Sequence, residues 1–243
     1  MCGIVGALAH RDVSSILLEG LYRLEYRGYD SAGIALIDDN KLARFRALGK
    51  VRELESKMSA DQPGHIGIAH TRWATHGEPS ETNAHPHFSS DRIAVVHNGI
   101  IENYKGIRER LLQNGYEFSS ETDSEVVAHL IDSYFDGDLF AAVKQAVDEL
   151  EGAFALGIIA IDDPRTLVAC RRGNPLVVGI GIKENFVASD VSALLPVTNR
   201  FVYLEEGDYV VLSGNEYQVY DAGGVAREPE EKTSEQTADA ASK

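Results

Sequence analysis

The sequence has few cysteines, few basic residues and no long hydrophobic run, and each shortage excludes a class of protein. Two cysteines in 243 residues cannot form a disulfide framework, so we expect a cytoplasmic protein. The 23 lysines and arginines stand against 38 acidic residues, and the net charge of −15 argues against nucleic-acid partners. No apolar run reaches about 18 residues, and the start does not resemble a signal peptide, so we expect no membrane contact and no export.

The remaining composition is that of an ordinary globular protein, with 44% hydrophobic residues and 22 glycines. Hydrophobic periodicity predicts a helix that begins at Val13 and stops at Gly28, and further helices at 51–58, 104–113, 124–135 and 139–149. It predicts strands at 3–10, 32–37, 41–48, 66–72, 92–97, 154–161, 166–171, 176–180, 186–188, 201–204, 209–212 and 217–220. Short turns at 162–164 and 213–215 indicate antiparallel hairpins. The sequence therefore predicts an α+β domain in which helices cover stacked antiparallel sheets.

The last part of the chain differs in composition from the rest. From Arg227 onward, aromatic and large aliphatic residues are absent, and Glu, Ser, Thr, Ala and Lys dominate. Such a segment cannot bury enough apolar surface to offset its ordering entropy. We therefore predict one domain over residues 2–225 and a disordered polar tail over residues 226–243.

Cys2 is the first candidate for a reactive group. A cysteine is often a small buried hydrophobic residue, and we interpret Cys170, inside an apolar stretch, in this way. Removal of Met1 would instead give Cys2 a free α-amine, whose pKa of about 7.7–8.0 suits a general base for the thiol. A nucleophile activated by its own N-terminal amine is an established arrangement. Gly3 would allow a substrate to approach the backbone closely.

A long polar loop over residues 73–90 and its flanking strands hold six of the eight histidines. Loops of this length are uncommon in compact domains and are often functional. The segment His85-Pro86-His87 raises the alternative of a zinc site, but no cysteine or carboxylate lies at a familiar ligand spacing around it. We therefore expect no metal, and one or two histidines in contact with a substrate.

Arg72 and Asp123 could bind a charged substrate. Arg72 ends a predicted strand just before the long loop, and its guanidinium could hold a carboxylate with two hydrogen bonds. Asp123 precedes a predicted helix, where an acidic residue is also a common cap. Together the two charges would match those of a free α-amino acid.

Asn98 and Gly99 follow a predicted strand directly. An Asn-Gly pair is usually a turn. After a strand it could also aim a side-chain amide and a backbone N–H at one point, which is what an oxyanion hole requires. No phosphate-binding loop or complete dinucleotide-binding motif is present in the sequence.

Nine blocks of the sequence, in this order, carry a resemblance to a known family: Met1–Gly6, Leu24–Gly33, His70–Gly77, Asn83–His87, His97–Asn103, Ser120–Val126, Glu184–Asp190, Ala193–Pro196 and Leu204–Asp208. Over residues 1 to about 225, the sequence resembles the glutaminase domain of glutamine–fructose-6-phosphate aminotransferases (glucosamine-6-phosphate synthases). These are class II glutamine amidotransferases, which belong to the N-terminal-nucleophile hydrolases.

The resemblance implies a four-layer αββα sandwich and a role for each site residue. Cys2 would be the nucleophile with its own amine as base, and Asn98 and Gly99 would form the oxyanion hole. Arg72 would bind the α-carboxylate of L-glutamine and Asp123 its α-amino group. Further pocket residues implied in the same way are Trp73, Thr75, His76 and His85, with Arg27 placing the N-terminal residue and Trp73 gating the passage of ammonia.

The implied reaction is hydrolysis of L-glutamine to glutamate and ammonia without a metal or organic cofactor. The complete synthases continue with sugar-isomerase domains that bind fructose 6-phosphate and accept the ammonia. Such domains are absent from this sequence, so the acceptor would be a domain or subunit outside this chain. Two alternatives stay open: a glutaminase of the purine-pathway phosphoribosyl amidotransferase type, and a non-catalytic glutamine-sensing module.

Overall fold

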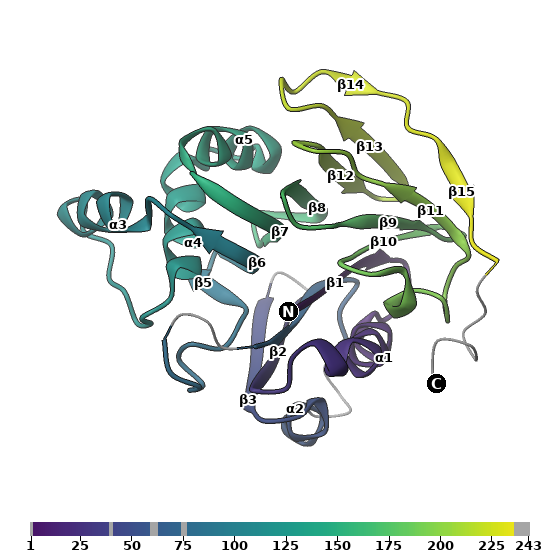
Figure 1. Cartoon of the computed structure of the whole chain (residues 1–243), viewed down its shortest axis with the longest axis horizontal. Coiled ribbons are helices and arrows are strands. Elements are labelled where there is room, and N and C mark those ends of the chain that lie inside the picture. Colours follow the sequence, from purple (N-terminus) through teal and green to yellow (C-terminus); the bar gives the residue numbers. More distant parts are fainter. Residues whose placement is uncertain (1, 39–40, 59–62, 74–76, 236–243) are drawn as a thin grey trace.

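The computed structural model describes residues 2–38, 41–58, 63–73 and 77–235. Two antiparallel sheets lie face to face, with one group of helices outside each sheet (Figure 1). The predicted α+β class and the αββα sandwich are therefore confirmed. None of the helices in these ranges combines the length and the apolar character that crossing a bilayer demands.

The first sheet contains the N-terminal strand near its centre. Strand β1 pairs antiparallel with β4 on one side and with β10 on the other. The eight strands are, in spatial order, β15 (Glu231–Thr233), β11 (Arg200–Tyr203), β9 (Val177–Ile180), β10 (Glu184–Ala188), β1 (Gly3–Ala9), β4 (Ile66–Arg72), β2 (Ser31–Asp38) and β3 (Lys41–Leu48).

The second sheet is built mainly from successive hairpins. Strands β6, β7 and β8 pair antiparallel in sequence order, and β12 joins β13, so both predicted hairpins are confirmed. The seven strands are, in spatial order, β14 (Ala226–Arg227), β13 (Glu216–Tyr220), β12 (Tyr209–Ser213), β8 (Asp163–Arg172), β7 (Gly152–Ala160), β6 (Ile93–Ile101) and β5 (His87–Ser89).

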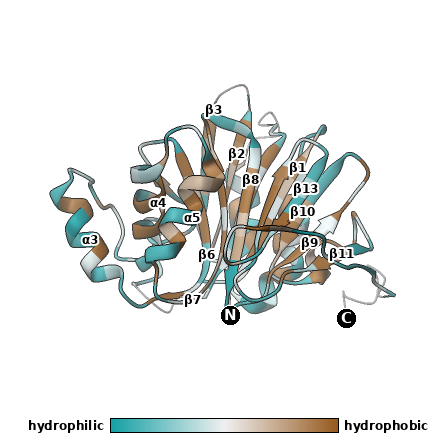
Figure 2. Cartoon of the chain, turned by 90° about the horizontal axis from the view of Figure 1, so that it is seen from above, coloured by the Kyte–Doolittle hydropathy of each residue, from teal (hydrophilic) through white to brown (hydrophobic). Residues whose placement is uncertain are grey.

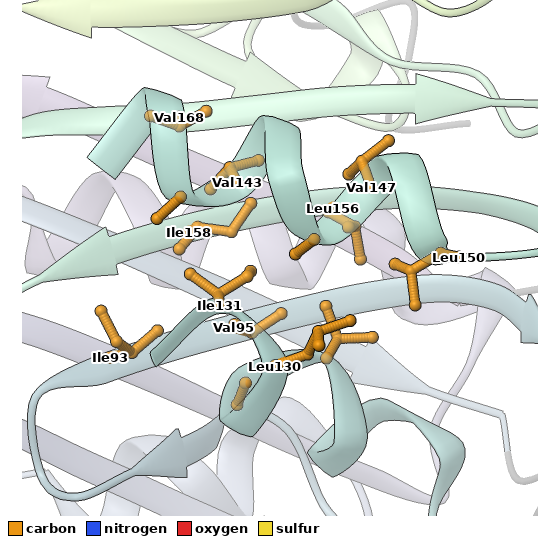
Figure 3. Packing of buried hydrophobic residues seen from close by; sticks show 14 of the residues in the cluster. Ile93, Val95, Leu130, Ile131, Val143, Val147, Leu150, Leu156, Ile158 and Val168 are labelled. Atoms are coloured by element: carbon orange, nitrogen blue, oxygen red, sulfur yellow. The ribbon is translucent and has the colours of Figure 1, made fainter. Parts of the chain in front are cut away.

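The helices fall into two groups. Helices α1 (Ser14–Leu24) and α2 (Val51–Lys57) bury their apolar faces on the outside of the first sheet. Helices α3 (Tyr104–Gln113), α4 (Asp123–Tyr134) and α5 (Leu139–Glu149) cover the second sheet. Figure 3 shows Leu130 and Ile131 of α4 packed against strand residues such as Val95.

Side chains from alternate positions of the strands fill the space between the sheets. On β1, Ile4 and Leu8 face the second sheet, whereas Val5 and Ala7 face α1. This is the two-residue period of a strand with both faces buried, which reads as a continuous apolar run in the sequence. Figure 2 accordingly shows hydrophobic residues concentrated in the strands.

The predicted disorder of the tail is wrong for two of its described segments. Strand β14 pairs with β13, and β15 pairs with β11. Residues 226–227 and 231–233 thus belong to the two sheets, beyond the predicted domain boundary at residue 225, whereas residues 236–243 of the predicted tail lie outside the described residues. Strand β15 is exposed at all three residues and polar, and its order comes from backbone pairing at a sheet edge, for which composition gives no signal.

The packing between the sheets can be tested with two isoleucines. Ile159 of β7 is completely buried between the sheets, whereas Ile182 is 91% exposed in a turn. Replacing Ile159 by Ala leaves a cavity and should lower the free energy of unfolding by about 2–5 kcal/mol in urea denaturation. Ile182→Ala is the matched control and should stay within about 0.5 kcal/mol. Equal effects of the two substitutions would contradict the assigned packing.

Candidate active site

Cys2 lies directly before β1, at a point that pairing on both sides of that strand fixes. Gly3 pairs with Thr71 of β4, and a Cβ at Gly3 would approach the Thr71 hydroxyl to 2.7 Å, so the strands meet closely here. The backbone N–H of Trp73, just after β4, donates a hydrogen bond to Cys2 Sγ at 3.3 Å. The start of β1 and the end of β4 therefore position the thiol together.

The electrostatic surroundings keep this thiol protonated. Burial raises the pKa of Cys2 above its usual value, while the Trp73 N–H and the Arg72 guanidinium act in the opposite direction. Because burial is the larger effect, the nucleophilic thiolate is scarce at neutral pH. Nucleophilic attack by Cys2 therefore requires a nearby base.

Arg72 and Asp123 line a cavity on one side of Cys2. Both are 4% exposed. The Arg72 guanidinium donates to the carbonyl oxygens of Gly77 and Glu78 at 3.2 and 3.3 Å. Asp123, at the start of α4, accepts a hydrogen bond from the Ile101 N–H at 2.8 Å. The structure thus brings together one fixed cation and one fixed anion from two different layers.

A second cavity of about 290 Å³ lies on another side of Cys2. Its lining includes Arg27, Asn98, Asn174 and Ser189, and Trp73 borders both cavities. The Arg27 guanidinium donates to the Asp190 carboxylate at 2.7 Å. Arg27, predicted to place the N-terminal residue, therefore lies in a cavity that Cys2 also lines.

Asn98 and Gly99 belong to β6 and lie next to Cys2, where the second sheet reaches the first. The Asn98 side-chain Nδ2 donates to the Cys2 carbonyl oxygen at 3.2 Å. Gly99 has φ +128°, and a Cβ there would lie 2.0 Å from the Ala153 carbonyl oxygen, so only glycine fits. Asn98 and Gly99 thus lie beside Cys2, and all three line the same cavity.

Four histidines form a buried cluster behind these donors. The ring centroid of His85 lies 4.0 Å from that of His70, 4.7 Å from that of His87 and 6.4 Å from that of His97. Burial lowers the pKa of His70 and of His87 to about 3, and lowers those of His85 and His97. His85 lines the same cavity as Arg72 and Asp123, and its predicted contact with a substrate stays a prediction.

The cluster does not have the arrangement of a metal centre. Within residues 2–38, 41–58, 63–73 and 77–235, no group of three or more His, Cys, Asp or Glu side chains could hold a metal ion.

Thr75 and His76, both predicted to line the pocket, lie outside the described residues.

The sequence matches the family described as the glutamine amidotransferase domain over residues 70–196. This match covers more than half of the chain, including Arg72, Asn98 and Asp123. The chain belongs to this family. Cys2 lies outside the matched range, and its place in the site rests on the contacts with Trp73 and Asn98.

Curated relatives of this amidotransferase are similar along its whole length. A glutamine–fructose-6-phosphate aminotransferase (isomerizing) of Idiomarina loihiensis is 57% identical over 247 residues, which is 100% of this chain and 40% of that protein. The enzyme of the same name from Pseudomonas aeruginosa is 55% identical and covers 92% of the chain and 37% of its own length. The chain thus spans about 40% of the length of such relatives.

Solved structures give the same fold. The glutamine phosphoribosylpyrophosphate amidotransferase of B. subtilis matches with a TM-score of 0.79 at 25% identity, covering 91% of this chain and 49% of that one. A glutamine aminotransferase class-II domain protein of Silicibacter pomeroyi has a TM-score of 0.62 at 17% identity, covering 90% and 99% of the two chains. The latter shows the fold alone.

Several residues of the candidate site were not predicted from the sequence. Asn174 and Ser189 line the second cavity, and Ser189 accepts a hydrogen bond from the Ile4 N–H at 3.0 Å. His70 contacts the Asn98 side chain. Asn174 follows Gly173 at the end of β8, a position where a functional side chain could have been suspected. His70 lies within β4 and Ser189 directly follows β10, and neither carries a spacing signal of its own.

The segment that leads into Asp123 is held by one buried carboxylate, Glu125. Burial alone would raise its pKa, but the His129 ring at 3.7 Å and hydrogen bonds from the N–H and hydroxyl groups of Ser119 and Ser120 lower the pKa well below its usual value. A lowered carboxylate pKa stabilises the folded state above the unfolded-state pKa, and this contribution is lost as the pH falls below it.

Glu125→Gln should therefore destabilise the protein by about 2–3 kcal/mol at pH 7, because the amide cannot accept all of these hydrogen bonds. The difference from the unsubstituted chain should stay constant down to about pH 5 and shrink below it, since only the carboxylate titrates. Urea denaturation followed by circular dichroism at pH 8, 6 and 4 measures this. A difference that grows as the pH falls would contradict the assignment.

Proposed function

We propose that this chain hydrolyses L-glutamine to glutamate and ammonia with Cys2 as the nucleophile. The observation that carries the proposal is the position of Cys2: it borders a cavity with Arg72 and Asp123 and lies beside the donors of Asn98 and Gly99. An amino acid held by its α-carboxylate and α-amino group would extend its side-chain amide towards the thiol. Separate groups would then bind the substrate, attack its side-chain amide and stabilise the charge that develops.

The first step forms a thioester. The α-amine of Cys2, free once Met1 is removed, takes the thiol proton, and the sulfur attacks the side-chain amide carbon of glutamine. The negative charge that develops on the amide oxygen is stabilised by Asn98 Nδ2 and the Gly99 N–H. The amine returns its proton to the departing nitrogen, and ammonia leaves as the C–N bond breaks.

The second step releases glutamate. A water molecule gives a proton to the same amine and attacks the thioester carbon, and the oxyanion forms again in the same place. Its collapse breaks the C–S bond, and the proton returns to the sulfur. Atoms and charge balance without a cofactor, and no redox change occurs.

The proposed destination of the ammonia is fructose 6-phosphate, bound by a sugar-isomerase domain or subunit outside this chain, in the cytoplasm. The relatives with 53–57% identity are named for that sugar phosphate, whereas the purine-type enzymes are similar at 25–27% and through their structures. Trp73 is 44% exposed, borders both cavities and packs edge-on against Tyr29 at 5.6 Å between ring centroids. This position supports a gating role for Trp73 between the glutamine cavity and the acceptor.

Replacing the nucleophile tests the proposal directly. Cys2→Ala should lower ammonia release from L-glutamine to the background rate, because no covalent intermediate can form. Cys170→Ala is the matched control: Cys170 is 2% exposed in the second sheet and should leave kcat within about twofold. Intact mass must show that Met1 has been removed. Undiminished release from the Cys2 variant would disprove the mechanism.

The proposed contacts to the two charged groups of L-glutamine can be tested separately. Asp123→Asn should raise KM for L-glutamine but much less for glutaramate, which lacks the α-amino group. Arg72→Met should likewise penalise L-glutamine more than 4-aminobutanamide, which lacks the α-carboxylate. Losing one charge-assisted contact corresponds to about a 10- to 100-fold change in kcat/KM. Equal losses on glutamine and its truncated analogue would contradict the assigned contacts.

A further inference from the structure

The two proposed oxyanion donors differ in how freely they can turn. The Asn98 side chain ends in an amide whose oxygen and nitrogen can exchange places by rotation about one bond. The Gly99 N–H belongs to the peptide unit that joins it to Asn98, and glycine gives that unit more freedom than any other residue. Without further contacts, both donors could turn away from the reacting carbonyl, and catalysis depends on donors that are already oriented.

The His70 ring contacts the Asn98 side chain. His70 Nε2 lies 3.0 Å from Asn98 Oδ1 and 3.0 Å from the His97 carbonyl oxygen. Both partners are acceptors, so Nε2 carries a hydrogen and donates to both. Because His70 holds the amide oxygen, the amide nitrogen must point the other way, where it reaches the Cys2 carbonyl oxygen at 3.2 Å.

The His70 ring is itself held in place. His70 is 1% exposed on β4 and stacks on His85 with 4.0 Å between ring centroids. Burial lowers its pKa to about 3, so the ring is neutral at working pH. Its Nδ1 has no hydrogen-bond partner in the described part of the chain, which fits the neutral ring with its hydrogen on Nε2.

Asn174 contacts the Asn98–Gly99 peptide group, which carries the second proposed donor, the Gly99 N–H. Asn174 Nδ2 donates to the Asn98 carbonyl oxygen at 2.9 Å. That oxygen and the Gly99 N–H belong to one planar peptide group and point in opposite directions. A Cβ at Gly99 would lie 2.6 Å from Asn174 Nδ2, so the Asn174 amide packs directly on this glycine.

We propose that His70 and Asn174 are positioning residues for the oxyanion hole: His70 orients the Asn98 side-chain amide, and Asn174 orients the Asn98–Gly99 peptide group. His70 lies on β4 of the first sheet, and Asn174 lies just after β8 of the second sheet, so each sheet aligns one donor. The inference rests on the proposed function, since it requires that these donors stabilise the oxyanion.

The test is a pair of double-mutant cycles on glutamine hydrolysis by the full chain. His70→Leu should lower kcat about 10- to 100-fold with KM within about threefold, because oxyanion donors act in the transition state. His70→Gln, which keeps an N–H near the position of Nε2, should recover most of kcat. His65→Leu removes an exposed imidazole just before β4, at the end of the strand opposite to Arg72, and should keep kcat within about twofold.

The background of Asn98→Ala separates the two residues. There, His70→Leu should have no further effect on kcat beyond about twofold, because its target is gone. Asn174→Asp, which replaces the donor by an acceptor, should still lower kcat about 10-fold in that background, because it acts through the Gly99 N–H. If His70→Leu does not fold by circular dichroism, His70→Asn, too short to reach Asn98 Oδ1, carries the same expectation.

The outcomes distinguish a failure of the proposed oxyanion hole from a failure of the positioning roles of His70 and Asn174. If Asn98→Ala leaves kcat unchanged, the proposed oxyanion hole is wrong. If Asn98→Ala lowers kcat but the His70 substitution costs the same in both backgrounds, His70 has only a structural role and the inference fails. A loss from Asn174→Asp that disappears when Asn98 is Ala would overturn the role assigned to Asn174.

Discussion

The site depends on one constraint, the central position of β1 in the first sheet. Because β4 and β10 pair with both of its edges, the start of β1 cannot move without breaking two rows of backbone hydrogen bonds. Cys2, one residue before this strand, therefore has a fixed position although it lies near the N-terminus. A terminal residue is normally among the least ordered of a domain. Here the sheet supplies the rigidity that the proposed nucleophile requires.

The same constraint explains why the candidate site lies where the two sheets meet beside the start of β1. Arg72 ends β4, the neighbour of β1, and Asn98 and Gly99 lie on β6, in the facing sheet. The apolar layer between the sheets, with Ile4 and Ile68 on one side and Val96 and Ala155 on the other, sets the separation of these residues. A change in this packing would move the proposed oxyanion donors relative to Cys2.

Much of this arrangement could be predicted from the sequence. The predicted helices at 104–113 and 139–149 match α3 and α5 in both bounds, because amphipathic periodicity marks both helices and the Asp138 side chain caps α5. Residue type and a family resemblance point to Cys2, Arg72, Asn98 and Asp123 in the sequence, and the fold brings them to one place.

In contrast, β5 and β15 are three residues long and are ordered by backbone pairing, which leaves no pattern in side chains. His70 and Asn174 could not be found for a similar reason: their contacts join residues 28 and 76 positions apart.

The buried histidines bear on the identity of the general base. A histidine is the usual base for a cysteine nucleophile, and four histidines lie behind this site. However, burial lowers the pKa values of His70 and His87 to about 3 and also lowers those of His85 and His97. A base with such a pKa holds a proton too weakly to take one from a thiol whose own pKa burial has raised. An α-amine, with an ordinary pKa of about 7.7–8.0, matches the thiol far better. The neutral histidine cluster therefore favours the amine of Cys2 itself as the base and leaves the imidazoles to fix the geometry around it.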